Sequence, residues 1–450
     1  MKKRLLLLVP FLAPAGWGEV LRLDLASVER ETLAHSPRLM AAQETTRAAE
    51  FRAGAQRSLL SPVLALDGSY RHQSEVPAFK ASPLGAPVEL GDNTNYSVGP
   101  AINWLAWDSG AVRGGANALS RQASARSEDV RSTETQLRLA AQTQYFQVQG
   151  AAEQVRLLAD GLRLAQAQRD DVRVRNQAGA ASRQDLLQAE TEVLARRREF
   201  REVQTALAMG VRDLLTLMGQ GKTLDLARPL PESLATLRPE GVPEPTLILS
   251  LPATASLRAE FAPAADRPFD SARPELVSLS LEAEAARFAA RAAKAGHGPS
   301  VQLLAKTSRD YPNGPVHEVI TQNTFGAVAR WPLFEAGRVT RQVKEQEALA
   351  RSTDNRLRQT EDNLWRDWQR ARDRLAGLLE EAGYERDSVR ERERLAKLVY
   401  DAYRAGQTPF LEVQAANLGL LQAQSQSVIT EVNILSQLAL LRSLSTEVTP

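Results

Sequence analysis

Side chains that could carry out chemistry are few in this chain, and their spacing fits no common reaction. Cysteine is absent, which excludes disulfides, thiolate metal sites and cysteine catalysis. The segment Gly219–Thr223 (GQGKT) partly resembles a phosphate-binding loop, but Thr216 stands where GxxxxGK[ST] requires its first glycine. We interpret this segment as a helix-end turn. The histidines show no metal-ligand spacing: His35, His72, His297 and His317. We therefore expect that the protein is not an enzyme and that it binds neither a cofactor nor a metal ion.

Two acidic residues stand out because they occupy equivalent places in a duplicated chain. Residues 36–70 reappear as 273–307 at an offset of 237, without a gap. A second block repeats at an offset of 227, and there Gly179 and Asp185 match Gly406 and Glu412. An offset held over so long a stretch indicates an internal duplication of roughly 200 residues, much longer than a solenoid repeat. The sequence thus predicts two similar halves and a pseudo-symmetric architecture.

Long helices must position these acidic residues. Residues 109–176 and 337–404 contain no proline, and their apolar residues recur at steps of three and four, which is typical of coiled coils. Each segment would be about 100 Å long as a helix. A glycine turn around Gly179 or Gly406 follows, and then a shorter helix over 183–218 or 409–445. A further helix is expected over 37–60, within a helical stretch that starts at residue 19.

A β-hairpin precedes each long helix, at 62–105 and at 300–333. The strands alternate apolar and polar residues and are about ten residues long, which fits a membrane-spanning strand. A small water-soluble β-domain with one buried face would show the same alternation. Several aromatic residues near the strand ends favour the membrane, where such residues form interfacial girdles: Tyr96, Trp104, Trp107, Trp331 and Phe334.

The N-terminus predicts export. Lys2, Lys3 and Arg4 precede an apolar run too short to span a bilayer, so we interpret residues 1–18 as a signal peptide. The alternative is a buried N-terminal helix or strand. The first repeat would cover 19–225, and the second would cover 273–450. The proline-rich residues 226–272 would form an irregular linker with one short strand near Leu247. The net charge of +2 disfavours nucleic acid as a partner.

The expected strands would also require assembly in a membrane. Four strands cannot close a barrel, for which about eight are the minimum. An open sheet edge is not tolerated in lipid. If these strands span a membrane, several copies of the chain must therefore share one barrel.

The sequence resembles the TolC-type outer-membrane efflux family over essentially the whole mature chain. The resemblance rests on the order and spacing of short motifs, namely Trp104–Gly110 (WLAWDSG), Trp331–Gly337 (WPLFEAG), Ala272–Leu276 (ARPEL) and Tyr403–Gly406 (YRAG). It implies a mainly α-helical fold with membrane β-hairpins, in which a homotrimer builds a periplasmic α-barrel topped by a shared 12-stranded β-barrel. It further implies an outer-membrane exit duct with a large periplasmic portion. Such a duct works with a periplasmic adaptor and an inner-membrane pump and performs no chemistry itself.

The resemblance also implies a gate at the periplasmic helix tips, formed by residues at and after the two glycine turns: Gly179, Ser182, Asp185, Tyr403, Gly406, Thr408 and Glu412. By correspondence with the family, Asp185 would bond to Tyr403, and Glu412 would narrow the pore. This sequence differs from the family pattern at two positions: Thr408 replaces an arginine, and Ala415 replaces a second acidic residue. The contacts that hold the gate closed are therefore expected to be weaker or built differently. Asp185→Ala or Tyr403→Phe would then raise conductance. The simpler role for both acidic residues is a favourable charge at a helix N-terminus.

A soluble periplasmic coiled-coil scaffold, such as an adaptor, is the main alternative. It would share the helical hairpins but would need β-domains of its own. The amphipathic hairpins discriminate between the two functions, because a scaffold has no use for an apolar sheet face exposed to lipid.

Overall fold

The computed structural model of the chain describes residues 21–79, 88–220, 247–249 and 251–446. The expected signal peptide and the linker residues 226–246 lie outside these ranges. The chain divides into two units, which do not coincide with the repeats. The strand unit comprises 41–132 and 272–362, and the tip unit comprises the described residues up to Met40, 133–271 and those from Asn363 onwards. Each unit thus contains parts of both repeats.

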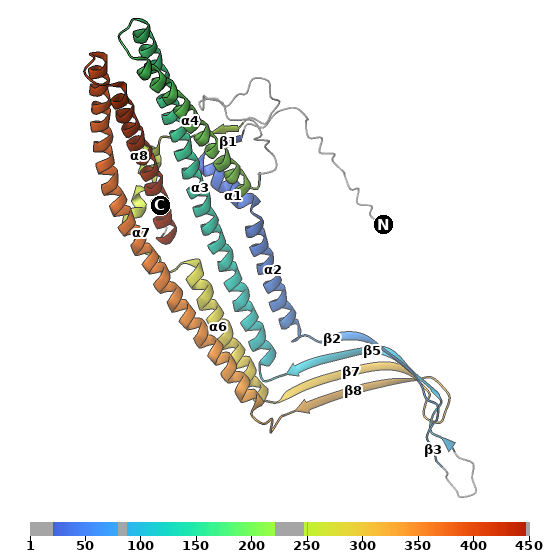
Figure 1. Ribbon diagram of the computed structural model, residues 1–450. Coiled ribbons are helices and arrows are strands. Elements are labelled where there is room, and N and C mark those ends of the chain that lie inside the picture. The colour runs from blue at the N-terminus through green and yellow to red at the C-terminus, as the bar shows by residue number, and fades with distance from the viewer. Residues whose placement is uncertain (1–20, 80–87, 221–246, 250, 447–450) are drawn as a thin grey trace, which may run out of the picture. The chain divides into compact units, whose positions relative to one another are not determined.

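Four antiparallel strands form the sheet of the strand unit, in the order β2-β5-β7-β8 (Figure 1). Their bounds are Val63–His72, Thr94–Trp107, Ser300–Tyr311 and Ile320–Arg330. The segment between β2 and β5 also contains a short strand pair, β3 (Ala78–Phe79) and β4 (Val88–Glu89). Strands of two residues are too short to be predicted from alternation. The register places Ile102 opposite Leu64 on one side and opposite Ala305 on the other. The apolar residues predicted to share one face therefore do so across neighbouring strands.

Both expected long helices are present, as α3 (Ala111–Gln177) and α7 (Arg338–Arg404), each of 67 residues. The shorter helices after the glycine turns are α4 (Arg183–Leu217) and α8 (Phe410–Leu444). The helices α2 (Pro37–Ser58) and α6 (Pro274–Lys294) both begin at a proline, which suits a first helical turn. A Cβ added at Gly114 of α3 would lie 2.9 Å from the Cβ of Ala292 in α6, so small residues let these helices approach closely.

The two strand-to-helix junctions have the same geometry, as the sequence duplication predicts. The indole of Trp104 donates a hydrogen bond to the carbonyl of Leu60 at 2.9 Å, and that of Trp331 donates to the carbonyl of His297 at 3.1 Å. Each junction then turns through two residues of positive φ: Ser109 and Gly110 in the first half, Ala336 and Gly337 in the second. Residues that are 227 positions apart in the sequence thus form the same strand-to-helix junction in both halves.

The tip unit has its own core, in which α3, α4 and α8 pack with α1 (Leu25–His35) and α5 (Thr254–Phe261). Phe146 of α3 meets Phe261 of α5 edge-on, with ring centroids 5.4 Å apart. Two expectations need correction here. Residues 21–23 form a strand, β1, rather than helix, because they pair in parallel with β6 (Leu247–Leu249). Residues 254–261 are helical rather than irregular, since the prolines of this stretch flank the helix instead of interrupting it.

None of the described helices combines the length and the apolar composition that a membrane-spanning helix requires.

Candidate functional site at the helix tips

Two nearly identical turns join the long helices to the short ones. Gly179 and Gly406 adopt φ values of +75° and +76°, which L side chains rarely adopt. The amide of Gly179 donates to the carbonyl of Asn176, and the next amide donates to the carbonyl of Arg175. Gly406 and Gln407 make the equivalent pair of bonds. Both long helices therefore end in a Schellman motif, as the glycine positions predicted.

The two turns differ where the short helices begin. Ser182 is the N-cap of α4: its hydroxyl accepts from the amide of Asp185 at 3.0 Å, while the carboxylate of Asp185 accepts from the amide and the hydroxyl of Ser182. This reciprocal arrangement is a capping box. Pro409 is the N-cap of α8 and supplies no side-chain bond. Asp185 thus caps its own helix, whereas Glu412 lies in the first turn of a helix that has no side-chain cap.

A small apolar cluster joins the two turns to each other. We call it the tip cluster; it consists of Val172, Ala189, Tyr403, Phe410 and Val413. Tyr403 is only 5% exposed, and its ring meets that of Phe410 at 5.3 Å between centroids. Because these residues come from α3, α4, α7 and α8, the cluster holds the first helical hairpin against the second.

Polar contacts between the two turns were not predicted from the sequence. Arg175 of α3 donates to the carbonyl of Arg404 at 2.9 Å, and its guanidinium lies 5.3 Å from the centre of the Tyr403 ring. Tyr400 of α7 donates to the carboxylate of Asp171 at 3.1 Å. The repeat pattern could not indicate these contacts, because each joins residues 229 positions apart that are not equivalent in the two halves.

The structure brings six of the seven predicted gate residues to one cleft of about 600 Å³ between the turns: Gly179, Ser182, Asp185, Tyr403, Gly406 and Thr408. Glu412 does not line this cleft and is exposed. The hydroxyls of Tyr403 and Thr408 are buried and have no hydrogen-bond partner in the described part of the chain. The expected bond between Tyr403 and Asp185 is therefore absent from the single chain, and packing of the Tyr403 ring links the turns instead.

The tip tyrosines predict a dependence on alkaline pH. Burial, followed by the charge of Asp185, raises the pKa of Tyr403 above its ordinary value near 10, and burial with the charge of Asp171 does the same for Tyr400. Above about pH 10 these tyrosine hydroxyls therefore lose their protons more readily when the tips are separated than when they are packed. The stability gained from packing the tips is complete below about pH 10 and declines above it. We expect protease cleavage near Gly406 to accelerate above about pH 10. Unchanged cleavage up to pH 11 would contradict this expectation, and a protease that is stable in alkali provides the assay.

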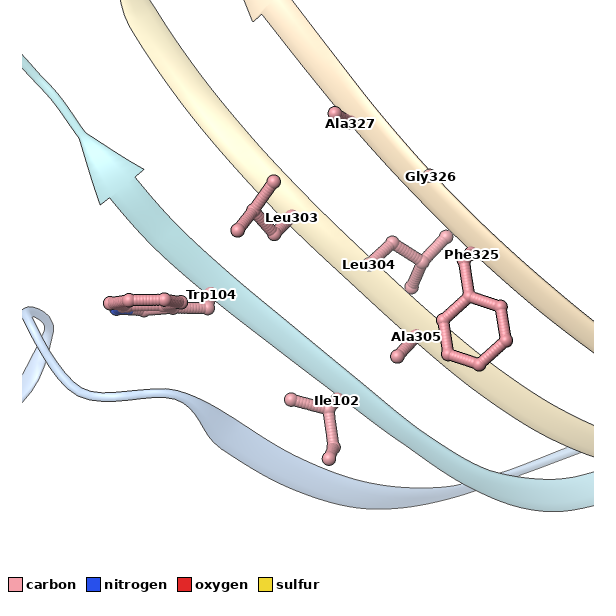
Figure 2. A pocket seen from close by; sticks show the side chains of 8 residues that line it. All are labelled: Ile102, Trp104, Leu303, Leu304, Ala305, Phe325, Gly326 and Ala327. Atoms are coloured by element: carbon pink, nitrogen blue, oxygen red, sulfur yellow. The ribbon is translucent and has the colours of Figure 1, made fainter.

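A second notable surface is the apolar face of the sheet. Side chains of β5, β7 and β8 line a hollow of about 500 Å³. Figure 2 shows how these side chains lie on the strands. The lining of the hollow contains no charged residue: Ile102, Trp104, Leu303, Leu304, Ala305, Phe325, Gly326 and Ala327. Phe325 is 82% exposed in the single chain. The predicted girdle residues are likewise exposed: Tyr96, Trp104, Trp107, Trp331 and Phe334. Continuous apolar surface of this kind marks contact with a partner or a membrane.

The remaining candidates for chemistry do not gather into a site. Within the described ranges, no three His, Asp or Glu side chains are grouped so that they could hold a metal ion. Gly219 has φ +74°, and its amide and the next one donate to carbonyls of the last turn of α4. The first residues of the loop-like segment thus end a helix, as interpreted from the sequence, while residues 221–223 lie outside the described ranges.

Comparison with known proteins agrees with these features. The sequence matches the family described as outer membrane efflux protein over residues 28–220 and 270–446. No match was found among curated protein sequences. Among solved structures, the fold is similar to CusC, at 17% identity and a TM-score of 0.73 over 97% of this chain and 96% of that one.

Two further outer-membrane proteins of known structure show the same likeness. VceC from Vibrio cholerae is 18% identical, with a TM-score of 0.71 over 93% of this chain and 95% of that one. The open state of the MtrE outer membrane channel from Neisseria gonorrhoeae is 17% identical, with a TM-score of 0.70 over 93% and 88%. The chain therefore has the mainly α-helical fold with long helical hairpins and two β-hairpins that these proteins share.

Proposed function

Because the chain belongs to the outer membrane efflux protein family, we propose that it is the exit duct of a tripartite efflux or type I secretion system. Family membership places it in the outer membrane as a channel protein and not an enzyme. Its proposed partners are two further copies of itself, a periplasmic adaptor and an inner-membrane pump. The proposed duct is passive, takes no cofactor, and is gated at the periplasmic helix tips.

The open four-stranded sheet is the observation that carries this proposal. Strands β2 and β8 form its two edges, with β5 and β7 between them. Exposed edges and an exposed apolar face are both unfavourable in a water-soluble monomer. In lipid the apolar face is favourable, but the edges must be paired. Other copies of the chain can supply that pairing.

The strand directions suit a ring of copies. Neighbouring strands of the sheet are all antiparallel, so β2 and β8 run in opposite directions. The β8 edge of one copy can therefore pair antiparallel with the β2 edge of the next, which is a head-to-tail contact that closes into a ring. Three copies would give twelve strands, above the minimum of about eight for a barrel.

The helix tips support a gate by their construction. Each tip ends in a glycine turn, and a few side chains in the tip cluster hold the two hairpins of one chain together. A small cluster at the end of long helices can separate without disturbing the core around Phe146. The solved open state of MtrE concerns that protein; for this chain, opening by separation of the tips is our proposal.

Acidic residues near the tips lead to a prediction about ion selectivity. Three copies of Asp185 and Glu412 around an axis would favour cations over anions. We expect Asp185→Ala to move the reversal potential in a salt gradient towards the nonselective value. Ser182→Ala is the matched control, because it disrupts the same capping box but removes no charge. An equal shift in both variants would show that the cap, and not the charge, is responsible.

Conductance of the purified full chain in planar bilayers tests the proposed function. We expect a detergent-extracted, heat-modifiable oligomer that inserts and conducts ions. A monomer that is soluble without detergent and does not conduct would instead support a periplasmic scaffold and would overturn the proposal.

A further inference from the structure

Basic residues outnumber acidic ones in the strand unit where its helices meet the sheet. The last turns of α2 and α6, the first turns of α3 and α7, and the short links to the strands cover residues 51–62, 285–299, 108–121 and 331–344. These four segments hold ten Lys or Arg and only two acidic residues. The other 395 residues hold 46 Lys or Arg and 52 acidic residues. A chain of nearly balanced charge thus carries one strongly basic zone.

The acidic residues of this zone are already engaged locally. Asp108 accepts bonds from the amides of Gly110 and Val112 at the start of α3. Glu335 forms an ion pair with Arg338 at 2.6 Å. They therefore leave most of the positive charge in the zone uncompensated.

Most basic residues of the zone lack an acidic partner. Arg121, Arg287 and Arg338 form ion pairs with acidic residues. The other seven are exposed and form no ion pair within the described chain: Arg52, Arg57, Arg113, Arg291, Lys294, Arg341 and Lys344. We call these seven residues the basic belt. Unpaired basic residues also occur elsewhere in the described chain, for example Arg370, Arg386 and Lys397. What distinguishes the zone is its excess of positive charge, because acidic residues outnumber basic ones in the rest of the sequence.

The belt adjoins the surface that suits lipid tails. One end of each of the four strands lies at the helix ends that carry the belt (Figure 1). Trp104 and Trp331 lie at the same junctions, and their indole N–H groups bond to Leu60 and His297 just before the strands. A surface that is apolar, then aromatic, then basic follows the order of acyl chains, interface and headgroup phosphates in a bilayer leaflet.

A groove in this zone could receive a phosphate. Arg287, Arg291 and Lys294 of α6 line one side of a cavity of about 460 Å³. The α7 side contributes Arg351 and two acidic residues, Glu347 and Asp354, and Asp354 pairs with Arg287, so the lining keeps a net positive charge. The floor of the cavity includes the small apolar residues Ala290 and Ala350. A cationic wall over an apolar floor suits a headgroup whose acyl chains continue along the sheet.

From this continuity we infer that the basic belt binds the phosphates of anionic phospholipids in the periplasmic leaflet of the outer membrane. The inference rests on the proposed function, because it requires that the strands cross the membrane and that the helices lie in the periplasm. Zwitterionic lipids would bind less tightly, since their own cation offsets the phosphate. Attraction of basic side chains to an anionic surface is additive and falls off within about a Debye length, so it is confined to these first turns.

Lipid titration of the purified full chain, followed by native mass spectrometry, tests this inference. The probes are phosphatidylglycerol and phosphatidylcholine with identical acyl chains. The test variant is Arg291→Gln/Lys294→Gln/Arg341→Gln. The control, Arg370→Gln/Arg386→Gln/Lys397→Gln, makes the same change of charge at exposed residues of the tip unit that form no ion pair in the described chain. All six residues are exposed, so circular dichroism should show unchanged helix content in both variants.

The wild type and the control should prefer phosphatidylglycerol, and the test variant should lose about tenfold or more in affinity for it while keeping its affinity for phosphatidylcholine. Equal binding of the two lipids by a wild type that conducts in planar bilayers would overturn the inference and leave the proposed function intact. An equal loss in both variants would also overturn it, because net charge alone would then be responsible. A wild-type protein that does not insert into bilayers would contradict the proposed function, and the inference about lipid binding would fall with it.

Discussion

Phe325→Arg is expected to abolish assembly of the chain in membranes. Phe325 lies at the middle of β8 on the apolar face and is 82% exposed in the single chain. If this face meets lipid, an arginine there costs about 2–4 kcal/mol per copy, and about 6–12 kcal/mol for three copies that share a barrel. Urea titration of folding into lipid vesicles should show this loss, and the heat-modifiable oligomer should disappear from gels.

Thr324→Arg is the matched control for that substitution. Thr324 neighbours Phe325, is also exposed, and lies opposite Lys306 on the polar face of the sheet. We expect it to assemble with nearly wild-type stability, because this face would line the aqueous interior. In a water-soluble protein both exposed positions would tolerate arginine. Equal tolerance of the two substitutions would therefore contradict a lipid-facing sheet.

Tyr403→Ala has the second largest expected effect, namely separation of the helix tips. The tyrosine ring is buried, packs against Phe410 of α8 and lies under the guanidinium of Arg175 of α3. Removal of a buried aromatic side chain typically costs about 3–5 kcal/mol. The loss is confined to the tips, since the core around Phe146 lies elsewhere in the tip unit. We expect a several-fold higher conductance in planar bilayers and faster protease cleavage near Gly406.

Tyr403→Phe separates the role of the ring from that of the hydroxyl. The hydroxyl is buried without a partner in the described chain, so its removal should leave conductance near the wild-type value. If phenylalanine raised conductance as much as alanine does, the hydroxyl would be the latch, through a bond to another copy. If Tyr403→Ala destabilised the tips without raising conductance, the tip cluster would be structural and would not act as a gate.

The sequence predicted features that depend on local patterns. Proline-free runs with apolar residues at steps of three and four gave α3 and α7 within two residues of their ends. Glycine after each long helix predicted the tip turns, because only a residue that tolerates positive φ ends a helix in this way. Alternation gave the strands, and the register confirmed which residues share the apolar face.

Features that depend on tertiary contacts could not be predicted in this way. Arg175 and Asp171 bind partners on α7 that are 229 residues distant, and neither periodicity nor the repeat indicates such pairs. The strand β1 exists only because β6 pairs with it. Pro252 and Pro263 suggested an irregular linker and concealed α5 between them. The differences between the halves, rather than their similarity, therefore determine how the tips meet.

Crosslinking between sheet edges tests the central claim, that copies of this chain share one barrel, most directly. The natural sequence lacks cysteine, so Ser69→Cys in β2 with Gln322→Cys or Thr324→Cys in β8 introduces the only thiols. Within one chain these edges lie on opposite sides of β5 and β7, roughly 14 Å apart, which is too far for a disulfide. Oxidation in membranes should give covalent dimers and a covalent trimer as the largest species, while each single-cysteine variant remains uncrosslinked at the β2–β8 junction. Monomers alone, or a ladder that extends beyond three chains, would contradict the account.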